Sequence, residues 1–292
     1  MALRRLLSLG AGATAEVFLA RADGGRLVAV KIAHKATASS EPLRRLFLAE
    51  ADAARQVRHP RLVACLATAH APLAMVLRYV EGPSLAELIA ASPLPLPCAL
   101  RVLIDVAEGL AALNAEGRTH GDLCPRNVLV DRHGKTFLTD FGAADAAPAE
   151  HAYLGTVGYA APEVCRGARC DARADCFSLG VLMWELMRGE RLHCADALTE
   201  SVRLWKFAET PAPALDHDRP DLARYAPLAA QLLTLDPAQR TIAAREVAVA
   251  LSTATPVAER PTLASHVVRA FADEAQRREN ALNAVAARYG DG

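Results

Sequence analysis

A loop in the middle of the chain carries the residues best suited to chemistry. Asp122 and Asn127 stand five positions apart in the loop segment 120–127, directly before an apolar strand at 128–130. Asp140 follows Asn127 by thirteen residues and begins an Asp-Phe-Gly triplet. Two carboxylates and one amide that converge on a loop surface offer the oxygen ligands that Mg²⁺ prefers. The spacing therefore predicts a site for Mg²⁺-dependent chemistry.

Two features near the N-terminus could bind phosphate. Gly10 and Gly12 lie between apolar runs, and glycines there let the backbone approach a phosphate group closely. Lys31 lies on an apolar strand, where a lysine is costly to bury unless a partner neutralises its charge. Glu50, on the helix that follows, is the natural partner. A plain hairpin turn and a structural ion pair would leave the same patterns, and the residues alone leave these alternatives open.

The elements that must position these residues change character near residue 80. Apolar runs and turn signals predict a strand-rich first part, with strands over 3–9, 16–20, 27–32, 62–67 and 73–80. One helix is predicted within this first part, from Pro42 to before His59. After residue 80 helical periodicity dominates, and it predicts helices over 84–90, 96–115, 172–187 and 226–235. The joint, Glu81-Gly82-Pro83, has the composition of a hinge. The sequence predicts an α+β fold in two parts.

Composition excludes several classes of protein. The 292 residues carry 33 basic and 33 acidic side chains, and this neutral balance argues against a protein that coats nucleic acid. Apolar residues make up 52%, too many for a disordered chain. The seven cysteines form no Cys-x-x-Cys pair, so we expect neither a secreted disulfide framework nor a zinc site. No apolar stretch could span a membrane and no signal peptide is recognisable, so a cytoplasmic location is the expectation.

Two more motifs complete an ordered set. Ala161-Pro162-Glu163 ends a segment that holds Gly155-Thr156-Val-Gly-Tyr159. With the loop motifs above, in this order and at this spacing, the chain resembles the eukaryotic-type protein kinase family over roughly residues 3–252. The resemblance implies a bilobal fold, in which a five-stranded sheet with one helix packs on a larger helical lobe and ATP lies between them. It implies an N-lobe at 1–80, a C-lobe at 81–253 and a helical extension at 254–292.

The resemblance also assigns roles in nucleotide binding. Gly10 and Gly12 would cover the phosphates, Lys31 would hold the α- and β-phosphates, and Glu50 would fix Lys31. The remaining expected contacts surround the adenine: Leu9, Val17 and Ala29 from the strands, Leu77 as gatekeeper, the backbone of Arg78 and Val80 in the hinge, and Leu129 as the floor.

The same resemblance assigns the catalytic and structural roles. Asp122 would accept the proton of the substrate hydroxyl, and Asn127 and Asp140 would bind Mg²⁺ or Mn²⁺. The resemblance also implies supporting roles: Thr156 would bond to Asp122 in the substrate-docking loop, Asp175 would accept hydrogen bonds from the catalytic loop, and Arg240 would pair with Glu163.

Three residues depart from the family pattern near the reacting groups. Ala15 replaces the third loop glycine, and its methyl group should stiffen the loop and weaken ATP binding. Cys124 replaces the lysine of Ser/Thr members that contacts the γ-phosphate, and a neutral thiol supplies no charge. Arg126 could supply that charge instead, as in tyrosine kinases, or it could be a simple exposed arginine.

A fourth departure concerns regulation. Gly121 stands where many members carry an arginine that pairs with a phosphorylated activation-loop residue. The segment 141–152 contains no hydroxyl side chain, and only Tyr153, Thr156 and Tyr159 carry one before Glu163. We therefore expect activity that does not depend on activation-loop phosphorylation.

These features favour a kinase that phosphorylates Ser or Thr in a protein substrate. A tyrosine or dual-specificity kinase, a pseudokinase scaffold and a small-molecule kinase are the alternatives. Lys31, Asp122 and Asp140 argue against the pseudokinase, and Glu163, Arg240 and the docking loop argue against the small-molecule kinase. The extension at 254–292 carries a partly helical apolar stripe, from Leu263 to Tyr289, that would pack on the C-lobe or on a partner, another copy included.

Overall fold

The computed structural model describes residues 3–142, 144, 156–193, 209–253 and 256–289, with side chains described up to residue 283 in the last range. Its first part is an antiparallel five-stranded sheet of order β1-β2-β3-β5-β4. The strands are β1 (Leu3–Ala11), β2 (Ala15–Ala22), β3 (Leu27–Ala33), β4 (Cys65–His70) and β5 (Leu73–Arg78). β3 is central, and Lys31 on it pairs with Val17 of β2 and Met75 of β5.

Two helices accompany the sheet, α1 (Lys35–Ser39) and α2 (Glu41–Gln56). Proline in the first turn of α2 suits a helix start, since that position needs no N–H donor. Phe47, Glu50 and Ala54 recur at helical spacing and are all buried, so α2 presents one face to the core. Glu50 is thereby carried into the interior on the face that packs towards the sheet.

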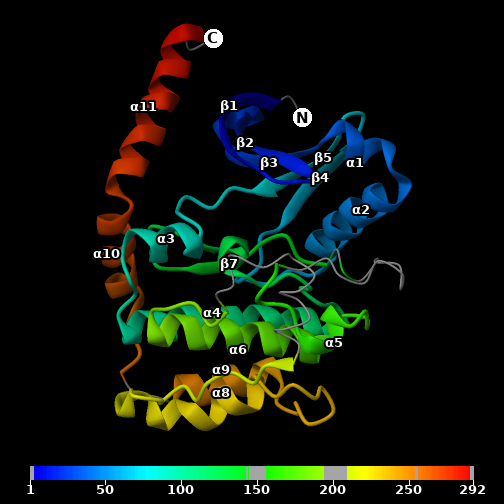
Figure 1. The fold of residues 1–292 in the computed structure, drawn as a ribbon. Coiled ribbons are helices and arrows are strands. Elements are labelled where there is room, and N and C mark those ends of the chain that lie inside the picture. The colour runs from blue at the N-terminus through cyan, green and yellow to red at the C-terminus, as the bar shows by residue number, and fades with distance from the viewer. Residues whose placement is uncertain (1–2, 143, 145–155, 194–208, 254–255, 290–292) are drawn as a thin grey trace.

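The second part is helical and larger, as Figure 1 shows, so the expected bilobal kinase fold is observed. Its central helix, α4 (Leu96–Ala115), is mostly buried and packs against α6 (Ala172–Arg188) and α9 (Ala244–Ser252). This part also contains the helices α3 (Leu85–Ala91), α5 (Pro162–Cys165), α8 (Ala226–Leu232), α10 (Arg260–Ala270) and α11 (Ala272–Tyr289), and a small hairpin of β6 (Val128–Val130) and β7 (Thr136–Leu138). Within the described ranges, no helix combines the length and apolarity that crossing a membrane requires.

The strand predicted over 62–67 is wrong in its position. Leu62 forms only an isolated bridge, to Leu138, and the N–H of Val63 donates to the carbonyl of Leu138. The chain after the helix therefore first pairs with β7 of the helical lobe, and β4 begins only at Cys65. Residues 62–63 and the start of β4 are both buried, so the apolar pattern is continuous across them. The sequence therefore gives no sign of where the pairing changes from one lobe to the other.

The C-terminal helices lie along one side of both lobes. α10 packs against α4 and α3 of the helical lobe, and α11 continues alongside the sheet, where it contacts β1 (Figure 1). The expected apolar contacts of the extension are present at Leu263 and Val267, which are buried. Of the predicted stripe, the side chains of Val285 and Tyr289 lie outside the described residues.

Candidate functional site

A cleft of about 660 Å³ lies between the sheet and the helical lobe. The glycine-rich turn, β2, β3, the end of β5, the hinge and the loop after α4 all contribute to its walls. The sequence-predicted residues that line it are Leu9, Gly10, Gly12, Val17, Ala29, Leu77, Arg78, Val80, Arg126, Asn127, Leu129 and Asp140. Segments separated by more than a hundred residues thus meet around one cavity.

Lys31 is not among the residues that line the cleft, but it contacts the lining residue Asp140. Its Nζ donates to Glu50 Oε1 at 2.6 Å and to Asp140 Oδ1 at 2.8 Å. Burial lowers the pKa of Lys31, but the two carboxylates outweigh burial and the net direction is upward. Lys31 is therefore a permanent cation, with Glu50 from α2 on one side and Asp140 on the other. Among the described residues this pair of contacts joins the sheet lobe to the Asp-Phe-Gly segment.

Asp140 is fixed in an unusual backbone conformation. Its φ of 57° is left-handed, which is uncommon for a residue other than glycine. Burial raises the pKa of Asp140, but Lys31 lowers it further, so the carboxylate is ionised. Gly142, two residues on, has φ of 88°, and a Cβ there would overlap the Cβ of Ala53 on α2. The glycine is needed both for this conformation and for the close approach of α2.

Asp122 is held from both sides. Its Oδ1 accepts from the N–H of Thr156 at 2.7 Å and from the Thr156 hydroxyl at 2.8 Å, while Asn127 Nδ2 donates to Oδ2 at 3.0 Å. Burial raises the pKa of Asp122, and the hydrogen bonds from Thr156 and Asn127 oppose it only in part. The result is an oriented carboxylate that binds a proton more readily than an exposed aspartate.

The loop that carries Asp122 is anchored from below by α6. Asp175, fully buried at the start of that helix, accepts from the N–H of His120 at 2.8 Å and from that of Gly121 at 2.9 Å. Burial lowers the pKa of His120 to about 4, so its imidazole is neutral. These two hydrogen bonds to one carboxylate fix the position of the loop relative to the start of α6.

The local structure explains why residue 121 is a glycine. Its φ is 78°, and a Cβ there would overlap the Cβ of Ala144, just after the Asp-Phe-Gly triplet. Any larger side chain at 121 would be strained and would push against this segment. The segment 145–155, which contains Tyr153, lies outside the described residues.

Cys124 and Arg126 face different environments. Cys124 is 1% exposed, and its Sγ lies 3.4 Å from the Thr156 hydroxyl. Burial and the nearby Asp122 raise the pKa of the Cys124 thiol, so it is neutral. Arg126 is exposed and donates from Nη2 to the Thr156 hydroxyl at 3.3 Å. Arg126 is therefore the basic side chain of this loop that reaches both the cleft and Thr156.

The hinge presents backbone to the cleft. Arg78 lays its guanidinium over the ring of Phe137, 4.7 Å from the centroid, which draws this side chain towards the helical lobe. The carbonyl of Val80 accepts from the N–H of Gly82 at 3.1 Å. Among the hydrogen bonds of the described residues, the N–H of Val80 has no acceptor, so it can serve a ligand.

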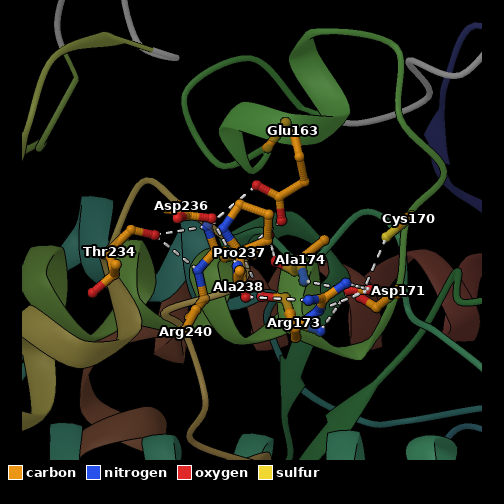
Figure 2. A network of polar contacts seen from close by, with 12 residues as sticks. Glu163, Cys170, Asp171, Arg173, Ala174, Thr234, Asp236, Pro237, Ala238 and Arg240 are labelled. Carbon is orange, nitrogen blue, oxygen red and sulfur yellow. Dashed lines mark hydrogen bonds and ion pairs between the residues drawn. The ribbon is translucent and has the colours of Figure 1, made fainter.

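A buried ion pair supports the segment after the docking loop. Arg240 is fully buried; its Nη1 lies 2.6 Å from Glu163 Oε1 and its Nη2 lies 3.2 Å from Oε2 (Figure 2). The carbonyls of Thr234 and Arg173 accept its remaining donors, and the ring of Phe177 lies beneath it at 4.9 Å. α5 is thus tied to α6 and to the chain before α9.

Several supporting residues carry no local signal in the sequence. The Tyr159 hydroxyl donates to buried Glu185 and accepts from Arg191 at 3.0 Å, which ties the docking loop to α6. The glycine-rich turn is held by α1 and the residue before it: the Thr37 hydroxyl donates to the carbonyl of Thr14 at 2.8 Å, and His34 bonds to that of Gly12 at 2.9 Å. The two members of each pair are far apart in sequence, and of these residues only Gly12 and Tyr159 belong to motifs described above. Only the folded chain reveals them.

The donor set at the inner end of the cleft fits a divalent cation. Asp140 and Asn127 both line the cleft, one with a carboxylate and the other with an amide whose Nδ2 is engaged by Asp122. The Asn127 amide oxygen is thereby left as a possible ligand. Among the described residues no cluster of three His, Cys, Asp or Glu side chains could hold a metal, as a zinc site would require. A cation that takes few protein ligands and keeps its other positions for water and phosphate suits this set.

Comparisons with known proteins agree on one family. Residues 3–249 match the family model described as a protein kinase domain. Serine/threonine-protein kinase pkn2 of Myxococcus xanthus is 35% identical over 270 residues, which cover 86% of this chain and 32% of that protein. Serine/threonine-protein kinase PrkC of Bacillus subtilis is 31% identical over 213 residues, with 70% and 33% covered. CBL-interacting protein kinase 4 of Oryza sativa is 40% identical over 200 residues, with 62% and 43% covered. The chain thus spans less than half of the length of these relatives.

Proposed function

The chain belongs to the protein kinase family, and on that premise we propose that it transfers the γ-phosphoryl group of ATP to a Ser or Thr hydroxyl of a protein substrate. The carrying observation is the oriented carboxylate of Asp122, held at 2.7–3.0 Å by Thr156 and Asn127 beside the nucleotide-sized cleft. A base fixed in this way needs little reorganisation before it meets a substrate hydroxyl.

Nucleotide binding would use the two ends of the cleft differently. The adenine would lie against Leu77 and Leu129 and accept a hydrogen bond from the N–H of Val80. The phosphates would lie under the glycine-rich turn, where Lys31 is a cation already held in place by Glu50. Leu9, Gly10, Gly12, Val17, Ala29 and Arg78 complete this proposed binding surface.

Asp140 and Asn127 would hold Mg²⁺ or Mn²⁺ with their oxygen atoms. When bound, the cation would neutralise charge on the phosphate oxygens. Asp140 is suited to this role because Lys31 keeps it ionised. Asn127 serves two purposes in this assignment, since its Nδ2 orients Asp122 while its oxygen stays available.

In the transfer step Asp122 would accept the proton of the substrate hydroxyl. The hydroxyl oxygen forms a bond to the γ-phosphorus, the bond from that phosphorus to the β–γ bridging oxygen breaks, and ADP leaves. Arg126, 3.3 Å from the Thr156 hydroxyl, would stabilise charge on the transferred group from the outer side. Cys124 is buried and neutral and takes no part in that charge stabilisation.

Substrate preference follows from Thr156 and the relatives. Thr156 bonds to Asp122 through both its N–H and its hydroxyl, which is the contact expected of a Ser/Thr-type docking loop. The matched relatives from Myxococcus xanthus and Bacillus subtilis are named serine/threonine-protein kinases. Arg126 stands at the position used by tyrosine kinases, so a tyrosine substrate is the competing assignment.

Activity should not require phosphorylation of the activation loop. Gly121 supplies no arginine to receive a phosphate, and the tight approach of Ala144 leaves no space for one. Thr156 is already engaged by Asp122. Phosphatase-treated protein should therefore keep its activity. Loss of activity together with a phosphate mapped to Tyr153 or Thr156 would contradict this reasoning.

The test of the proposed function is phosphoryl transfer by purified full-length protein. Labelled ATP, Mg²⁺ or Mn²⁺ and generic protein substrates should give labelled phosphoserine or phosphothreonine, and Asp122→Asn and Lys31→Met should abolish the label. Asp122→Asn keeps the shape of the side chain, and its melting temperature provides a check on folding. Equal signal in variants and wild type would refute the kinase assignment; nucleotide binding without transfer by the wild type would favour the pseudokinase.

A further inference from the structure

The C-terminal extension is anchored firmly to the helical lobe. Arg260, the first residue of α10, places Nη1 and Nη2 2.8 and 2.9 Å from the two oxygens of Asp105, which is fully buried in α4. Its Nη1 also donates to the carbonyl of Gly134 at 3.0 Å. Leu263 and Val267 bury the face of α10 behind this pair. The position of α10 is therefore set by a bidentate contact with a fully buried carboxylate.

From this anchor, α11 crosses the level of the hinge and contacts β1 (Figure 1). One of its residues, Arg278, lines the nucleotide cleft together with Leu9, Tyr79 and Gly82. The family match ends at residue 249, so this side chain comes from outside the matched domain. No other described residue beyond that limit lines the cleft.

Arg278 also lines a second cavity, on the opposite side. This groove, of about 420 Å³, lies between the hinge and the C-terminal helices, and Tyr79 and Gly82 line it as well. Since Arg278, Tyr79 and Gly82 are common to both cavities, they form the wall between them. The hinge edge of the cleft is closed in part by a single arginine side chain.

The guanidinium of Arg278 is held in place by its own helix. Its Nε donates to Glu274 Oε1 at 3.0 Å, and the ring of Phe271 lies 5.0 Å from its Cζ. It also approaches the Tyr79 hydroxyl: burial raises the pKa of Tyr79, and the charge and hydrogen bond of Arg278 oppose that effect. The side chain is 17% exposed, which is low for an arginine on a helix with an exposed face. Such a fixed donor set loses little entropy when it binds a ligand.

We propose that Arg278 is a nucleotide-positioning residue that contacts the sugar–base end of ATP at the hinge edge of the cleft. This inference rests on the proposed function for the identity of the nucleotide. The phosphates are already assigned to Lys31 and the glycine-rich turn, whereas Arg278 shares the hinge edge with Tyr79 and Gly82, so the sugar–base end is its proposed contact. The donors of Arg278 that Glu274 and Tyr79 do not use would pair with acceptors such as the ribose oxygens.

The chain supplies a matched control in the neighbouring residue. Arg277 pairs with the same carboxylate, since its Nε lies 2.9 Å from Glu274 Oε2, but it is 73% exposed and does not line the cleft. Removal of either arginine takes one cation from Glu274. Only removal of Arg278 takes a donor from the cleft.

The experiment measures equilibrium binding of ATP, ADP and adenosine to full-length protein, with Asp122→Asn as the background so that no turnover occurs. Arg278→Ala should weaken binding of all three ligands by about 10- to 150-fold, the usual value of a hydrogen bond to a charged group. Arg278→Lys should recover part of the loss, and Arg277→Ala should bind like the parent. In the active protein Arg278→Ala should raise KM for ATP and leave kcat and the melting temperature unchanged.

Three results would overturn the proposal. Equal affinities for Arg278→Ala and Arg277→Ala would show that the cleft contact contributes nothing. Weaker binding of ATP with unchanged binding of adenosine would move the contact to the phosphates. A lower kcat or melting temperature with unchanged affinity would make Arg278 a structural residue only. A protein that binds nucleotide in this pattern but transfers no phosphate would refute the proposed function and leave the role of Arg278 intact.

Discussion

Replacement of Arg240 by methionine should destabilise the protein strongly. The side chain is fully buried and makes two contacts with Glu163, at 2.6 and 3.2 Å, and further hydrogen bonds to two backbone carbonyls. Methionine fills a similar length but donates nothing. Glu163 and the carbonyls of Thr234 and Arg173 would then be left without their shared donor. The perturbation therefore isolates electrostatic and hydrogen-bonding loss from loss of volume.

The expected size follows from the burial of the partner that remains. Removal of one member of a buried ion pair costs about 3–5 kcal/mol, because the other charge stays without compensation. Glu163 keeps a side-chain exposure of 13%, so water can reach part of its carboxylate. We therefore expect the low end, about 3 kcal/mol. At about 2–4 °C per kcal/mol for a chain of this size, the melting temperature should fall by about 6–12 °C.

Thermal unfolding followed by circular dichroism provides the measurement, with two comparisons. Arg219→Met removes an exposed arginine that pairs with Asp221 at 2.8 Å, and it should leave the melting temperature unchanged. The double variant Arg240→Met/Glu163→Leu should recover at least half of the loss, because it also removes the uncompensated carboxylate. A melting temperature for Arg240→Met within 2 °C of wild type, a threshold of about 1 kcal/mol, would refute the reasoning.

Two further perturbations test the anchor of the extension and the carboxylate of Asp122 that we propose as the base. Arg260→Met should lower the melting temperature less than Arg240→Met does, because Asp105 keeps its contact with Arg61 at 3.0 Å. The same change should weaken ATP binding, because α11 would be held less firmly beside the cleft. Unchanged affinity for ATP would show that the Arg260 anchor does not affect nucleotide binding. Because burial raises the pKa of Asp122 and the base must be unprotonated, the acid limb of kcat should lie above the ordinary pKa of aspartate. Thr156→Val removes a hydrogen bond that opposes this rise, so the limb should move to higher pH; a limb that stays or moves down would contradict the assignment.

The sequence indicated which candidate site residues would lie close together where the motifs are local. The loop at 120–127 and the triplet at 140–142 each fix several residues within a few positions, and glycine conformations there leave few alternatives. It predicted α4 at 96–115 with its observed bounds, because that helix is long and strongly periodic. The strand predicted at 62–67 is misplaced, because the chain stays buried as it passes from one lobe to the other and the apolar pattern does not change there.

Contacts between distant segments could not be predicted in the same way. Asp105 is a charged residue in an apolar helix, and nothing near it in sequence names Arg260 as a partner 155 positions away. The position of Arg278 beside the hinge depends on where α10 is anchored and on the direction in which α11 leaves it. The anchor of α10 and the direction of α11 both depend on tertiary packing. The apolar stripe of the extension indicated only that this segment would pack against another surface.

Two departures from the family pattern, Cys124 and Arg126, both contact Thr156. Its hydroxyl lies 2.8 Å from Asp122, 3.3 Å from Arg126 and 3.4 Å from Cys124, so one oxygen meets all three. A lysine at 124 would need space that the 1% exposure of Cys124 denies, or it would have to displace Thr156. The thiol fits because it is small and neutral, and Arg126 brings the positive charge from the solvent side instead. A Cys124→Lys change alone should therefore disturb the Thr156–Asp122 contact before it can restore a phosphate-binding cation, and kcat should fall.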